Sequence, residues 1–116
     1  MKKAYFLKTC DTCRRIIKEI DTTDFVLQEI KTAPITVVQL EEMYGFTKSY
    51  EVLFNKRSKK YRAMDLKNQQ LLETDYRQLI LDEYTFLKRP VFIVDDEIFV
   101  GNAKKTIESL KESLKK

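Results

Sequence analysis

Two cysteines separated by two residues lie near the N-terminus, in the run Cys10-Asp11-Thr12-Cys13. The flanking pattern places them where a strand gives way to a helix. A cysteine at a helix N-terminus has its thiolate stabilised by unpaired backbone N–H groups and by the helix dipole. Cys13, one helical turn onward, can reach the sulfur of Cys10 and resolve a mixed disulfide formed there. The spacing therefore predicts a redox-active pair in which Cys10 attacks and Cys13 resolves.

Two other uses of the cysteines have to be weighed. Buried cysteines can simply fill space in a helix as small hydrophobic residues. A zinc site needs more Cys or His ligands than this chain offers, because it has two cysteines and no histidine. The lack of histidine also excludes Ser-His-Asp and Cys-His catalysis. We therefore expect no metal site and assign the chemistry to the thiols.

Two arginines could hold an anion near Cys10. Guanidinium groups match oxyanions bidentately and stay charged at physiological pH. Arg57 lies in the basic run from Lys56 to Arg62, which could equally be a solvated loop. Arg89 precedes Pro90 at the start of an apolar segment. A cis peptide bond at that point would make a tight loop that aims the arginine at a neighbouring site.

The composition describes one folded domain over residues 1–116. Hydrophobic residues make up 43% of the chain and charged residues 34%, with two glycines and two prolines. The apolar stretches are far shorter than the roughly 20 residues needed to cross a bilayer, so we expect a cytoplasmic protein. The net charge of +4 is compatible with an anionic partner but decides nothing alone.

The two ends of the chain carry the strands that would position the cysteines. Residues 4–7 and 25–30 are predicted as strands, and the helix between them has apolar residues at helical spacing. Such a β-α-β unit predicts parallel strands with a right-handed crossover. Residues 91–94 and 98–100 predict a β-hairpin, and an amphipathic helix follows from about residue 103 to 114.

Residues 36–85 between these ends predict a helical insertion. Thr36 and Gln39 have the spacing of a capping box, and Gly45 suits the C-terminal cap of the helix that follows. Thr74 can cap a further helix. The total order is β-α-β, helices, β-β-α, which is the plan of an α/β thioredoxin-like fold with a mixed central sheet.

These residues resemble a known family over the whole chain. Three segments carry the likeness: residues 10–14 after the first strand, the basic segment 55–62 in the insertion, and residues 88–91 before the hairpin that ends at Val100-Gly101. Together they are similar to the arsenate reductase (ArsC) and Spx group, a branch of the thioredoxin superfamily with a helical insertion.

The resemblance to the reductases implies an enzyme. The cysteine matching Cys10 attacks arsenate, and arginines matching Arg57 and Arg89 help to bind the oxyanion, with Thr12 and Arg14 as further candidates for anion binding. Glutathione and glutaredoxin then complete the reduction. The sequence departs from this pattern in two places: Cys13 stands where those enzymes commonly carry serine, and no arginine follows Arg89.

The resemblance to Spx implies a regulator instead. Spx has a C-x-x-C pair at this position and a segment similar to Arg57-Ser58-Lys59. It binds the RNA polymerase alpha subunit, and its disulfide changes its regulatory activity. Under either interpretation we expect a monomer with no bound cofactor, no direct contact with nucleic acid and no membrane attachment. Glutathione or glutaredoxin is the expected electron donor of an enzyme.

Overall fold

The structure, a computed structural model, describes residues 1–115. Contacts within the chain divide it into two compact units. One consists of Met1–Ala33 together with the chain from Arg89 onward, and the other of Pro34–Lys88. The first unit holds the sheet and both cysteines, and the second holds the helical insertion. The single domain over residues 1–116 stays a prediction.

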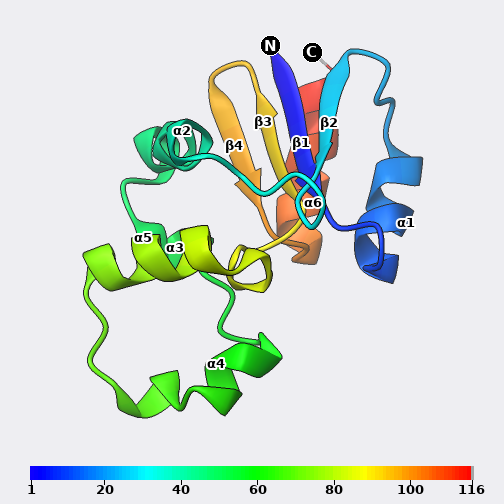
Figure 1. The fold of residues 1–116 in the computed structure, drawn as a ribbon. Coiled ribbons are helices and arrows are strands. Elements are labelled where there is room, and N and C mark those ends of the chain that lie inside the picture. The colour runs from blue at the N-terminus through cyan, green and yellow to red at the C-terminus, as the bar shows by residue number, and fades with distance from the viewer. Residues whose placement is uncertain (116) are drawn as a thin grey trace. The chain divides into compact units, whose positions relative to one another are not determined.

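A four-stranded mixed sheet forms the first unit (Figure 1). Its strands are β1 (Lys2–Phe6), β2 (Phe25–Glu29), β3 (Val91–Val94) and β4 (Glu97–Val100). Their order across the sheet is β2-β1-β3-β4. β1 and β2 run parallel as predicted, whereas β3 is antiparallel to β1 and to β4. The α/β class and the order of elements are thereby confirmed.

The first strand lies slightly earlier in the chain than the predicted segment 4–7. It ends at Phe6 because Leu7 already belongs to a turn, in which the Leu7 carbonyl accepts a hydrogen bond from the backbone N–H of Cys10 at 3.1 Å. The second strand ends at Glu29, one residue before the predicted end. These shifts leave the register intact, and Phe6 lies opposite Glu29.

One face of the sheet carries the core of the first unit. The helices α1 (Asp11–Glu19) and α6 (Lys104–Leu114) both contribute to it, and Figure 1 shows α6 behind the strands. The core residues are Ala4, Ile16, Phe25, Phe92, Val94, Phe99, Ile107 and Leu110. Full burial of one such large side chain stabilises a fold by about 1.5–3 kcal/mol. Burial of Ile16 in this core holds α1 against this face of the sheet.

The second unit is built from helices around an aromatic cluster. Its elements are α2 (Val37–Thr47), α3 (Tyr50–Leu53), α4 (Lys59–Ala63), η1 (Leu66–Asn68), α5 (Glu73–Asp82) and η2 (Tyr84–Phe86). Phe54 stacks on Phe86 with ring centroids 5.0 Å apart, and it meets Tyr61 and Tyr76 edge-on.

Within residues 1–115, no helix is long and apolar enough to span a membrane.

The predicted helix caps have mixed outcomes. The capping box of Thr36 and Gln39 is present at the start of α2. The prediction for Gly45 is wrong, because α2 continues through it to Thr47 and Lys48 takes the left-handed C-cap conformation, with φ of 57°. The prediction for Thr74 is also wrong. The N-cap position is taken by Leu72, two residues before Thr74, and α5 begins at Glu73.

Candidate active site

A tight turn delivers Cys10 to the start of α1. The backbone N–H of Cys10 donates to the Leu7 carbonyl, and the Arg14 N–H donates to the Cys10 carbonyl at 3.1 Å as the first helical bond. Cys10 is thus the N-cap residue, with extended φ and ψ of −92° and 111°. Sulfur at this position faces the unpaired N–H groups of the first turn.

The Cys10 sulfur is prepared to carry negative charge. Its Sγ accepts a hydrogen bond from the backbone N–H of Cys13 at 3.5 Å, and the side chain is partly exposed. Burial opposes ionisation, but the Cys13 N–H, the Cys13 thiol, the charge of Arg89 and the Thr12 N–H together lower the pKa of Cys10 below its ordinary value. These contacts favour the thiolate form of Cys10.

Cys13 differs from Cys10 in its exposure and in the direction of its pKa shift. It is fully buried, at 0% exposure, on the face of α1 that packs into the first unit. Burial raises the pKa of Cys13 to about 12, the Leu7 N–H acts against this rise, and the neighbouring Cys10 adds to it. The thiol consequently stays protonated at neutral pH and donates to the Cys10 sulfur. Both cysteines are free thiols.

Arg89 is the charged side chain that the structure brings to the two cysteines. Its positive charge lowers the pKa of both Cys10 and Cys13. The following Arg89–Pro90 peptide bond is cis, and the Pro90 carbonyl accepts a hydrogen bond from the N–H of Gly101 at 2.9 Å. Arg89 thus stands at the entrance to the β3–β4 hairpin, where it can also attract an anion approaching the thiolate.

Thr12 and Arg14 lie in the first turn of α1 beside Cys10. Thr12 acts on Cys10 through its backbone N–H. The Arg14 guanidinium makes an ion pair with the carboxylate of Asp11, and both side chains are exposed. An exposed pair of this kind contributes little to stability, so Arg14 can exchange Asp11 for another anion.

Arg57 belongs to the second unit, in the segment between α3 and α4. The backbone N–H of Arg57 donates to the side-chain oxygen of Asn55 at 3.0 Å, and Arg57 is exposed. Nearby lysines make ion pairs within this unit: Lys56 with Glu51, and Lys60 with Glu83. The basic run is therefore partly neutralised locally, and the role of Arg57 in anion binding stays a prediction.

Glu29 contacts the turn that leads to Cys10, and the sequence analysis did not single it out. Its carboxylate accepts a hydrogen bond from the backbone N–H of Lys8, two residues before Cys10, at 3.2 Å. The available signal was an acidic residue at the carboxyl end of a strand parallel to β1.

Within residues 1–115, no group of three cysteine or carboxylate side chains could hold a metal ion.

Comparison with known proteins relates the chain to one family. The model of the ArsC family matches residues 5–110. No curated protein sequence matches the chain. The solved structure of SACOL0876 from Staphylococcus aureus is similar, with 27% identity and a TM-score of 0.75, over 94% of this chain and 97% of that one.

Two further solved structures share the fold. The arsenate reductase from Vibrio cholerae has 15% identity and a TM-score of 0.72, over 96% of this chain and 95% of that one. An arsenate reductase (ArsC) related protein from Brucella melitensis has 22% identity and a TM-score of 0.68, over 96% and 94%. The chain therefore spans nearly the full length of each of these proteins.

Proposed function

The chain belongs to the ArsC family, and from that premise we propose that it is an arsenate reductase-like thiol oxidoreductase with Cys10 as its nucleophile. The observation that carries the proposal is the contrast between the two sulfurs. Cys10 is partly exposed at a helix N-cap with a lowered pKa, and Cys13 is buried with a raised one. Such a pair supplies one thiolate for attack and one protonated thiol behind it.

The first step is the attack of the Cys10 thiolate on arsenic(V) of arsenate. A sulfur–arsenic bond forms and one arsenate oxygen leaves as water after protonation. Arg89 favours this step because its charge offsets that of the incoming anion beside the thiolate. The backbone N–H groups of the first helical turn act in the same direction.

The second step forms a disulfide and releases arsenite. A second thiol attacks the Cys10 sulfur, loses its proton to the departing oxyanion and forms a sulfur–sulfur bond. The sulfur–arsenic bond breaks, and its electron pair stays on arsenic, which becomes arsenic(III). Cys13 can supply this thiol from within the chain, and glutathione can supply it from solution.

Two external thiols restore the reduced protein. In thiol–disulfide exchange, one thiolate takes one sulfur of the Cys10–Cys13 disulfide and a second releases the other, so glutathione or glutaredoxin is oxidised in turn. A disulfide of some other small molecule could replace arsenate as the substrate, because the same Cys10 thiolate attacks either centre.

A second candidate is an Spx-like redox switch, which the presence of Cys13 favours. A disulfide between Cys10 and Cys13 would remove the Cys10 thiolate and replace the hydrogen bond between the two sulfurs, at the first turn of α1. Such a change could alter a surface that binds the RNA polymerase alpha subunit. Binding of that subunit with equal affinity to the reduced and oxidised protein would argue against the switch.

The enzyme proposal is tested by measuring arsenite formed from arsenate with glutathione and glutaredoxin. We expect turnover by the parent, none by Cys10→Ser, and a fall of roughly 10- to 100-fold for Arg89→Ala, since loss of one charge-assisted contact costs roughly 1.5–3 kcal/mol. Arg15→Ala is the matched control, because Arg15 pairs with Glu19 on α1 and should leave the rate unchanged. Absence of arsenite with the parent would remove the arsenate assignment.

A further inference from the structure

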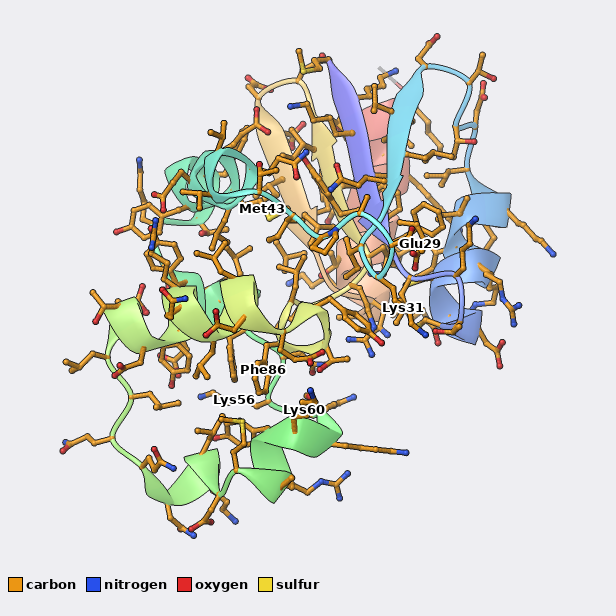
Figure 2. The ribbon with its side chains drawn as sticks, viewed as in Figure 1. Glu29, Lys31, Met43, Lys56, Lys60 and Phe86 are labelled. Atoms are coloured by element: carbon orange, nitrogen blue, oxygen red, sulfur yellow. The ribbon has the colours of Figure 1, made fainter. Side chains whose placement is uncertain are left out.

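Glu29 joins two loops at the end of the sheet where the cysteines begin. Figure 2 shows Glu29 at the end of β2, with Lys31 on the turn that follows. One carboxylate oxygen accepts the backbone N–H of Lys8 at 3.2 Å. The other accepts the backbone N–H and the hydroxyl of Thr32 at 2.9 and 3.0 Å. One side chain thus bridges the turn before α1 and the turn after β2.

Strand register explains why the carboxylate reaches Lys8. β1 and β2 are parallel, and Phe6 lies opposite Glu29, so the two strands end at the same edge of the sheet. Side chains alternate along a strand, which puts Glu29 on the same face as Phe25, a residue of the core that Ile16 of α1 also joins. The Glu29 side chain therefore lies on the α1 face.

The turn held by Glu29 serves both sulfurs. Its last residue is Cys10, whose N–H closes the turn on the Leu7 carbonyl. Its first residue, Leu7, acts on the Cys13 sulfur through its backbone N–H. A shift of this turn would change the position of Cys10 at the N-cap and the hydrogen bond to Cys13 together.

We propose that Glu29 is a positioning residue for the two cysteines: its carboxylate fixes the Leu7–Cys10 turn to the Lys31–Thr32 turn and so holds Cys10 at the N-cap of α1. The inference rests on the proposed function, but its test measures the reactivity of the Cys10 thiol and needs no substrate. Hydrogen bonds of a charged acceptor to backbone N–H groups are among the stronger ones in proteins, which suits this role.

The sign of the effect separates positioning from simple charge. Glu29 is anionic at neutral pH: burial opposes its charge, but the N–H groups of Thr32, Lys8 and Lys31 and the Thr32 hydroxyl lower the pKa of its carboxyl. A negative charge near Cys10 would disfavour the thiolate, so its removal alone would make Cys10 more reactive. Loss of positioning would make Cys10 less reactive, because the turn would no longer present the sulfur to the helix N–H groups.

The experiment measures the rate at which iodoacetamide alkylates Cys10 across pH 5–9, for the parent, Glu29→Ala and Glu29→Gln. We expect Glu29→Ala to react about three- to tenfold more slowly at pH 7, with the midpoint of its pH profile moved up. Glu29→Gln keeps an acceptor oxygen and should stay nearer the parent. Glu97→Ala is the control, because Glu97 is a strand glutamate of the same unit that accepts only from Ser113 at 3.0 Å among the bonds described.

Three results would overturn the proposal. An unchanged alkylation profile in Glu29→Ala would show that the side chain only stabilises the fold, and faster alkylation in both variants would show a charge effect. If Glu29→Ala fails to fold, Thr32→Val replaces it, since it removes one bond that orients the carboxylate and should slow alkylation in the same direction. Rapid hydrogen exchange of the Lys8 amide in the parent would also contradict the proposed bond. The alkylation rates and the hydrogen exchange test the role of Glu29 even if the parent does not reduce arsenate.

Discussion

The backbone N–H of Cys13 points at the sulfur of Cys10, 3.5 Å away, while the sulfur of Cys13 itself is withdrawn from solvent. One turn of helix therefore gives the two cysteines opposite properties. The first is exposed to reagents and favoured as a thiolate, and the second is covered and favoured as a thiol. This contrast yields direct expectations about reactivity and stability.

The reduced protein should be alkylated at Cys10 alone. Because the pKa of Cys10 lies below its ordinary value, the rate with iodoacetamide should rise with pH and level off earlier than for a free cysteine, whose pKa is about 8.5. Mass spectrometry of the alkylated peptide identifies the site. Modification of Cys13 at a similar rate in the folded protein would contradict the assignment, and alkylation of both sites after unfolding in denaturant is the control.

Alkaline pH should weaken the fold through Cys13. Its pKa is raised to about 12 in the folded protein, so the unfolded chain loses this proton first. The stabilisation is complete below the unfolded pKa of about 8.5 and is lost as pH rises towards 12, by at most about 1.4 kcal/mol per pH unit. Denaturant unfolding under reducing conditions at pH 8 to 10 should show a steeper decline for the parent than for Cys13→Ala. Parallel curves would refute the linkage.

Thr36 and Thr74 should differ in their effect on the second unit. Thr36→Ala removes the cap in which the Thr36 hydroxyl accepts the Gln39 N–H at 3.1 Å, and it should lower the free energy of unfolding by about 1 kcal/mol. Thr74→Ala is the matched control, since Thr74 lies inside α5 and should change stability by less than about 0.5 kcal/mol. Equal losses measured by denaturant titration would mean that the cap at Thr36 contributes nothing specific.

Local patterns in the sequence were sufficient to predict the position of Cys10 and Cys13. Their environment depends on neighbours in the chain: the strand that precedes them, the helix that follows, and the N–H groups between. Glu29 could not be found in this way. It is 21 residues from Lys8 in the sequence, and only the pairing of β1 with β2 in one register brings their polar groups together.

The helix ends show the limit of residue preference. Gly45 was predicted as a cap because glycine readily takes positive φ, but Lys48 takes that conformation and its N–H donates to the Tyr44 carbonyl at 2.8 Å. At α5, the Asp75 carboxylate accepts the N–H of Leu72 at 2.8 Å, so the helix starts without a capping hydroxyl from Thr74. In both cases a neighbouring residue, and not the predicted one, caps the end of the helix.

The central place of β1 in the sheet affects the order in which the protein can assemble during synthesis. β1 lies between β2 and β3, and β3 comes from residues 91–94, after the whole second unit has been made. Phe92 of β3 packs with Ala4 and Phe25 in the core. One edge of β1 therefore stays unpaired while residues 34–88 are synthesised. The turn from Leu7 to Cys10 thus leaves the ribosome early, whereas Arg89 is made late. The nascent chain therefore carries both thiols before it carries the charge that lowers their pKa.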